Sequence, residues 1–393
     1  MEDLEDKKGK FGELALASMP DLASTLPIGI NRSFWGKTKG VFEIASNLVC
    51  RQAIYKGEPV FQSMFGTEKT LGDIYTPVAA TIFIPDTTQT VTIQNRKTKF
   101  LDPSRMEHDL FVVRKDVPIW KVCGWSSMIP WVFSFAKEHW VSGPPSPETE
   151  DPEEQLPRLD ACNVSSAYAY APVDGAVSAA YGAIGAACKK NMVVVTVYKT
   201  KKAKPLNYKG GSRIAGWWLL GAFVSFYRSA IYALQNEGED KLAILKQMYD
   251  VKELCCKAKE ARTELEEIEE TEMPDHAQFH KYDLPTIKKV FNYQYSKMRA
   301  LIKEEWSDDT LERYAREGFV CCVSSGGAYA IDELAAITAL CDLVLEKVDP
   351  TDERQQKQGI INLITGTSAG SLNALYISQI HDKIFGLEVG MGE

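Results

Sequence analysis

The sequence predicts an α/β protein with a mainly parallel sheet and an inserted helical segment. Residues 318–380 alternate strand, glycine turn and helix twice, and this alternation is typical of parallel sheets. A second set of apolar strands and helices lies within residues 77–198, rich in β-branched residues. Between the two, residues 237–316 are charged and have helical apolar spacing, which predicts a helical hairpin or small bundle.

The first half of the chain begins with a lead-in, residues 1–34, that we expect to be weakly ordered or partly helical. Apolar residues recur with helical spacing over residues 39–64, which predicts an amphipathic helix. Residues 77–86 and 89–95 read as two strands joined by a short polar turn. Residues 119–135 (IWKVCGWSSMIPWVFSF) predict a buried helix that breaks near Pro130.

The middle of the chain starts with a proline-rich acidic stretch, residues 143–158, which we expect to be an exposed loop. Residues 169–190 predict a short strand, a glycine turn and a helix of small residues, and residues 191–198 predict a buried strand. The most apolar helical segment begins at Ile214 and ends at Leu234. Two roles stay open for that segment: a helix covering the core, or a peripheral contact with a membrane.

The charge and the cysteine content of the chain argue against some classes of function and of cellular location. The formal charge is −8 over 393 residues, so no basic excess exists to neutralise nucleic-acid phosphates, and we expect no nucleic-acid partner. The nine cysteines lie mostly in apolar runs, and the first residues are charged, without an apolar signal core. These features predict a cytoplasmic protein, for which a peripheral location at membranes stays open. Because the sequence has no run of about eighteen or more apolar residues, we expect no spanning helix.

The motif that carries most chemistry is GTSAG, from Gly366 to Gly370. It follows an apolar strand and opens a helix, which is the setting of a nucleophile elbow, so Ser368 is the candidate nucleophile. The glycines permit a strained turn, and the start of the helix favours negative charge. The alternative is a tight strand-to-helix turn without chemistry.

A glycine turn on the preceding strand is the candidate oxyanion hole. The backbone N–H groups of Gly326, Gly327 and Ala328, with that of Ala369, could point at a developing negative charge. No metal and no cofactor is needed for such a site. Cys255 and its neighbours match no common zinc spacing, so we expect plain thiols there.

The base is the next question, because a serine needs a group to take its proton. Only His381 follows Ser368, and the elbow helix should carry it away from the turn. A carboxylate is the alternative, and Asp174 lies in VDGAVSAA at the end of a short predicted strand. From the residues alone, Asp174 fits an ordinary Asp-Gly turn as well.

These blocks together resemble the patatin-like phospholipases. The resemblance rests on GTSAG after an apolar strand, the preceding glycine loop, VDGA, and the segment CGWSSMIPWVF. It implies a three-layer α/β/α domain and a serine–aspartate dyad, Ser368 with Asp174, without histidine. The activity it implies is acyl-ester hydrolysis of a phospholipid or similar lipid, through an acyl-enzyme.

The order of the blocks departs from the family, because the aspartate half precedes the serine half. This resembles a circular permutation, which a domain tolerates when its chain ends lie close together. The resulting division is a lead-in over 1–34, an aspartate half over 35–200, a helical insertion or linker over 201–317, and a serine half over 318–393. We therefore expect one domain assembled from two sequence-distant halves.

Two alternative functions remain open. One is an acyltransferase of the same fold, which passes the acyl group to an acceptor other than water. The other is a catalytically inactive lipid-binding or interaction protein, since Tyr329 stands where the family commonly has a basic residue. The oligomeric state, head group and acyl chain are not predicted by the sequence.

Overall fold

The computed structural model describes ten stretches of the chain and six further positions. The stretches are residues 9–17, 58–84, 89–96, 109–127, 136–139, 158–161, 191–197, 250–258, 284–324 and 329–387; the positions are 243, 246, 247, 260, 261 and 264.

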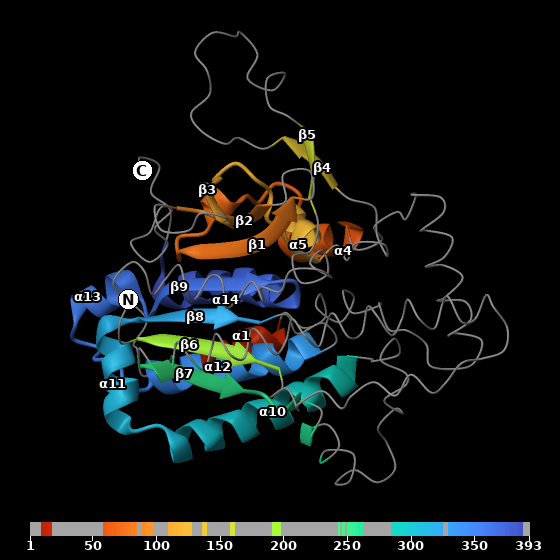
Figure 1. The fold of residues 1–393 in the computed structure, drawn as a ribbon. Coiled ribbons are helices and arrows are strands. Elements are labelled where there is room, and N and C mark those ends of the chain that lie inside the picture. Colours follow the sequence, from red (N-terminus) through yellow and green to blue (C-terminus); the bar gives the residue numbers. More distant parts are fainter. Residues whose placement is uncertain are drawn as a thin grey trace, which may run out of the picture.

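The core of the fold is a mixed, mostly parallel sheet of seven strands (Figure 1). Its order is β3-β2-β1-β9-β8-β6-β7. The strands are β1 (Val78–Ile84), β2 (Gln89–Gln94), β3 (Asp109–Val113), β6 (Met192–Thr196), β7 (Val251–Cys255), β8 (Phe319–Val323) and β9 (Ile361–Thr367). Only the β1–β2 pair is antiparallel. The predicted α/β class is confirmed.

The strands of the last quarter lie inside the sheet, between strands from earlier parts of the chain. In Figure 1 the blue strands β8 and β9 lie between the orange β1 and the green β6 and β7. Strand β9 pairs with β1 from Val78↔Ile364 to Thr81↔Thr367, and β8 pairs with β6 from Met192↔Val320 to Val195↔Val323. Segments remote in sequence therefore form one hydrogen-bonded sheet.

Helices flank this sheet, and most of them contribute residues to one hydrophobic core. They are α1 (Lys10–Ala17), α4 (Glu58–Phe65), the 3-10 turn η2 (Leu71–Asp73), α5 (Ile119–Ser127), α10 (Leu284–Glu305), α11 (Asp308–Glu317), α12 (Ala330–Leu345), α13 (Glu353–Gln358) and α14 (Ala369–Phe385). Helix α14 packs on β9 and β1, and α12 packs on α14, α10 and α1. A separate antiparallel pair joins β4 (Ala136–His139) to β5 (Arg158–Ala161).

Several predicted elements are confirmed where the structure describes them. The β1–β2 hairpin, the buried strand β6, and the alternation β8-α12-β9-α14 lie where the sequence places them. Helix α5 matches the first part of the segment predicted to break near Pro130. Helix α4 agrees with the end of the helix predicted over residues 39–64, whose earlier residues, 39–57, lie outside the described residues. The predicted loop before residue 158, the segment 169–190 and the apolar segment from Ile214 also lie outside them.

The prediction for residues 237–316 is wrong at one place. Residues Val251–Cys255 form the edge strand β7, which pairs in parallel with β6, instead of part of a helical bundle. The buried strand β6 offers this segment a full row of backbone partners, and that tertiary pairing overrides the helical spacing of its charged neighbours. Helices α10 and α11, from the same segment, agree with the prediction.

The lead-in contributes a docked helix. Phe11 and Ala15 of α1 are fully buried, and the carboxylate of Asp342 on α12 accepts the backbone N–H groups of Phe11 and Gly12 at 3.1 and 3.0 Å. Tyr295 of α10 donates its hydroxyl to the same carboxylate at 2.9 Å. Asp342 therefore holds the first turn of α1 on the core, because a carboxylate is well placed at a helix start.

Candidate active site

Ser368 lies at the turn between β9 and α14 in a strained backbone conformation. Its φ is 57° and its ψ is −124°. A residue with a side chain seldom adopts positive φ, and such strain costs on the order of 1–3 kcal/mol unless the surroundings enforce it. Strain of this kind is typical of a nucleophile elbow, where it lifts the serine hydroxyl above the end of the sheet.

The two glycines of the motif make this turn sterically possible. A Cβ atom on Gly366 would lie 2.1 Å from the carbonyl oxygen of Gly370, and one on Gly370 would lie 2.3 Å from the carbonyl oxygen of Ser324. Real Cβ atoms do not approach so closely, so both positions require glycine. The first turn of α14 consequently touches the end of β8.

That contact brings the start of the predicted oxyanion loop beside the elbow. Ser324 directly follows β8 and is the last described residue before the gap, and the loop residues Gly326, Gly327 and Ala328 lie outside the described residues. Ala369 is buried and is the first residue of α14. Its backbone N–H belongs to the first turn, whose donors have no partner within the helix.

A buried carboxylate braces the same region. Glu333 of α12 accepts the hydroxyl of Ser324 at 2.8 Å, and the side-chain amide of Asn373 on α14 donates to Ala330 O at 2.9 Å and to Glu333 at 3.4 Å. Asp332 and Glu333 are both fully buried. The end of β8, the start of α12 and the second turn of α14 are thus tied together.

Ser126 of α5 contacts the elbow from the other side. Its Oγ accepts the backbone N–H of Ser368 at 2.9 Å and lies 2.7 Å from the hydroxyl of Ser371. Sequence reasoning gave no role to Ser126, Glu333 or Asn373. The visible signals were a serine inside the segment quoted for the resemblance and two acids in the first turn of an apolar helix.

The proposed partner of Ser368 is not placed. Asp174 lies outside the described residues. Among the described residues no side chain is hydrogen-bonded to the hydroxyl of Ser368, a partly exposed residue. Tyr329, at the N-cap of α12, is half-buried and packs against the hydrophobic core. The pairing of Ser368 with Asp174 therefore stays a prediction.

His381 is a structural residue, as its position on the elbow helix indicates. It lies in the last part of α14, fully buried, and its Nε2 accepts the backbone N–H groups of Ile360 and Ile361 at 2.9 and 3.2 Å. These residues are at the start of β9, the opposite end from Ser368. Burial lowers the pKa of His381, and the nearby Asp382 carboxylate only partly opposes this.

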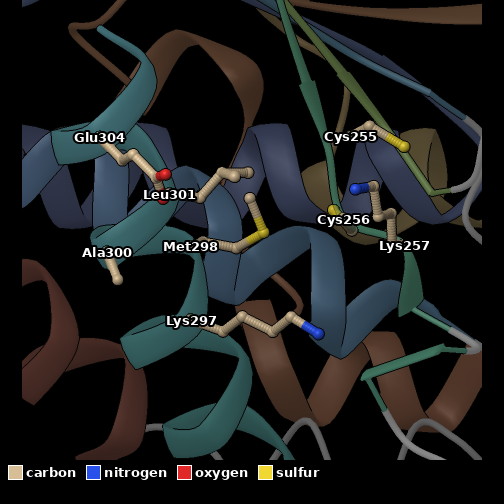
Figure 2. Close-up of a pocket in the computed structure, with 8 residues that line it drawn as sticks. All are labelled: Cys255, Cys256, Lys257, Lys297, Met298, Ala300, Leu301 and Glu304. Atoms are coloured by element: carbon tan, nitrogen blue, oxygen red, sulfur yellow. The ribbon is translucent and has the colours of Figure 1, made fainter.

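A small cavity lies elsewhere, beside the end of β7 (Figure 2). It measures about 260 Å³ and is lined by Cys255, Cys256, Lys257, Lys297, Met298, Ala300, Leu301 and Glu304. Both cysteines are free and buried, and burial raises the pKa of Cys256 well above its usual value. The described residues contain no cluster of His, Cys, Asp and Glu suited to a metal ion.

Comparisons with protein families, with curated proteins and with solved structures give no match to this chain. Among the described helices, none has both the length and the apolar character needed to cross a membrane. The site must therefore be interpreted from its own geometry.

Proposed function

We propose that this protein is a patatin-like lipid acyl hydrolase with Ser368 as its nucleophile. The observation that carries the proposal is the strained backbone of Ser368 between β9 and α14, with glycines on both sides that no other residue can replace. A strained serine with positive φ persists where the surrounding structure enforces it, and in a nucleophile elbow this conformation presents the serine hydroxyl to the substrate. The mostly parallel sheet, with the elbow at the end of a central strand, supports the same class.

The proposed reaction is hydrolysis of an acyl ester through a covalent intermediate. Asp174 takes the proton of the Ser368 hydroxyl as its oxygen attacks the ester carbonyl, and backbone N–H groups of residues 326–328 and Ala369 stabilise the oxyanion. The protonated Asp174 then gives its proton to the departing alcohol. Water, deprotonated by the same carboxylate, releases the fatty acid and restores the serine.

The finer features of the fold belong to this proposal. They are the three-layer α/β/α arrangement and the division into an aspartate half and a serine half, joined by residues 201–317, which supply strand β7 as well as helices. A phospholipid or similar acyl ester would reach the site from a lipid surface, with the segment from Ile214 to Leu234 as the candidate peripheral contact of a cytoplasmic protein. The interleaving of β8 and β9 with strands from the first half supports the two-half assembly.

The test uses the full chain with a p-nitrophenyl acyl ester and a fluorophosphonate probe. We expect the wild-type protein to hydrolyse the ester and to carry the probe on Ser368. Ser368→Ala should abolish both, and Asp174→Asn, which keeps the size of the side chain, should lower turnover by about 10²-fold or more, the usual scale for losing a general base. Ser378→Ala removes another buried serine hydroxyl of α14, at a site remote from the turn, and serves as the control.

The outcomes separate the alternatives. Absence of probe labelling in the folded wild-type protein would reject the hydrolase and favour an inactive lipid-binding protein. Labelling of Ser368 together with acyl transfer to an added alcohol or thiol, in preference to water, would favour an acyltransferase. Unchanged turnover in Asp174→Asn would remove Asp174 from the mechanism and leave the base to another group.

A further inference from the structure

We propose that Ser126 is a positioning residue whose hydroxyl holds the backbone of Ser368 in its strained conformation. This inference rests on the proposed function, because it concerns the same nucleophile turn. It adds a residue of helix α5, far from the elbow in sequence, to the residues on which the rate of the reaction depends.

The hydroxyl of Ser126 joins three segments. Its Oγ lies 2.9 Å from the backbone nitrogen of Ser368, 2.7 Å from Oγ of Ser371 in α14, and 2.8 Å from the carbonyl oxygen of Thr81 in β1. Ser371 in turn donates to the carbonyl oxygen of Gly366 at 2.7 Å. Ser126 and Ser371 are both fully buried, so water does not compete for these bonds.

The protons of this group can be assigned so that Ser368 always finds an acceptor. Each hydroxyl has one proton and two lone pairs. If Ser126 donates to Thr81 O, the Ser371 proton goes either to Gly366 O or to Ser126. If Ser126 donates to Ser371, Ser371 donates to Gly366 O. In each of these arrangements Ser126 Oγ keeps a lone pair for the N–H of Ser368.

The position of this bond explains why it is needed. The ladder between β1 and β9 ends at the Thr81↔Thr367 pair, and the ladder between β8 and β9 ends at Val323↔Gly366. Ser368 is thus the first residue beyond both ladders, and it is also the residue with strained φ. A backbone N–H that is shielded from water and has no partner is costly, and this N–H is partly buried, so Ser126 both satisfies the donor and fixes its direction.

Ser126 cannot contact substrate, because its side chain has no exposed surface. Loss of its hydroxyl should therefore act on the orientation of the nucleophile and not on substrate binding. A displacement of about 1 Å at a reacting group costs about 10²-fold in rate. The expected signature is a fall in kcat with little change in KM.

The test compares Ser126→Ala with the matched variant Ser378→Ala, which removes a buried serine hydroxyl whose bond stays within α14. We expect Ser126→Ala to lower kcat on the p-nitrophenyl ester by about 10²-fold with KM within threefold, since only orientation is lost. Ser378→Ala should keep wild-type kcat. Ser126→Thr, which retains the hydroxyl, should recover most of the lost rate.

A second measurement does not depend on activity. Residue-resolved hydrogen exchange should show faster exchange at the Ser368 amide in Ser126→Ala, while the amides of Ile361 to Thr365 stay protected. Equal kcat in Ser126→Ala and Ser378→Ala, or unchanged protection at Ser368, would overturn the proposal. If the wild-type protein has no esterase activity, the proposed function fails, and the exchange at Ser368 alone decides whether Ser126 holds the turn.

Discussion

The carboxylate of Asp382 accepts a hydrogen bond from the backbone N–H of Thr76 at 2.9 Å, although 306 residues separate them. It also accepts the N–H of Tyr75 at 2.7 Å and the hydroxyl of Thr76. Asn95 continues the contact by donating to the carbonyl oxygens of Ile74 and Thr76 at 2.8 and 2.9 Å. The end of the elbow helix is thus fastened to the chain that enters β1.

We expect Asp382→Ala to lower the free energy of unfolding by about 3 kcal/mol, because two backbone donors and a hydroxyl lose a charged acceptor in a buried place. The urea midpoint reports this change. Lys383→Ala, the neighbouring exposed residue, is the control and should have an effect below about 0.5 kcal/mol. Equal midpoints for the two variants would contradict the stabilising role of Asp382.

The stability should fall as the pH decreases below about 6.5, partly because of His381. Burial lowers the pKa of His381 below its usual 6.5, so the unfolded chain binds the proton first. The neutral ring is required, since Nε2 accepts two backbone N–H groups while Nδ1 lies 2.6 Å from the Thr76 hydroxyl. The contribution of neutral His381 to the free energy of unfolding is complete above pH 6.5, and it is lost as the pH falls from 6.5 toward the lowered pKa of His381 in the folded protein.

His381→Gln provides the comparison for this pH dependence. The variant has no titrating ring, so its urea midpoint should vary less between pH 7.5 and 5 than that of the wild-type protein. The remaining histidines and carboxylates titrate in both proteins and cancel in the difference. Parallel pH profiles would show that His381 does not titrate with unfolding.

Gly366→Ala and Gly370→Ala should both destroy the elbow. The new methyl group on Gly366 would lie 2.1 Å from the carbonyl oxygen of Gly370, and the one on Gly370 would lie 2.3 Å from that of Ser324. Relief of these clashes would separate α14 from β9 in the first case and from the end of β8 in the second. We expect loss of fluorophosphonate labelling and a lower melting temperature for each. Gly12→Ala is the control, because its Cβ would meet its nearest neighbour, the Asp342 carboxylate, at 3.4 Å; retained labelling in Gly366→Ala would contradict the assigned turn.

Asp342→Ala should release helix α1 from the core. The carboxylate accepts two backbone N–H groups at the start of α1 and the hydroxyl of Tyr295. Without it, we expect faster hydrogen exchange and proteolysis within residues 9–17, while the exchange of α12 amides changes little. Asp352→Ala, the same substitution at the residue before α13, is the control. Equal cleavage of the two variants would argue against this docking.

Much of the fold could be predicted because its signals are local. The alternation from β8 to α14 is set by apolar runs interrupted by glycine turns, and the turn residues themselves dictate the backbone. Strand β7 could not be predicted in the same way, because the sequence around Val251–Cys255 has no strong strand pattern of its own. Its conformation comes from pairing with β6, a contact between residues about sixty positions apart.

The candidate site likewise has one part that is recognisable in the sequence and one part that depends on tertiary packing. Ser368 and its glycines are recognisable because the spacing of the motif and the turn from strand to helix are contained in five consecutive residues. Ser126 is not recognisable, because one buried serine hydroxyl has no distinctive pattern in sequence and its partner is 242 residues away. Only the packing of α5 against β1 and α14 brings the two together.

The place of β9 in the sheet has a consequence for the synthesis of this protein on the ribosome. Until residues 361–367 emerge, β1 can pair with β2 on one side only, and its other edge lacks its partner β9. Such an edge attracts strands of other chains, and contacts between distant segments form slowly. Nascent and prematurely terminated chains should therefore depend on chaperones until β9 and β8 fill the gap, and chains that stop before residue 361 should accumulate in inclusion bodies.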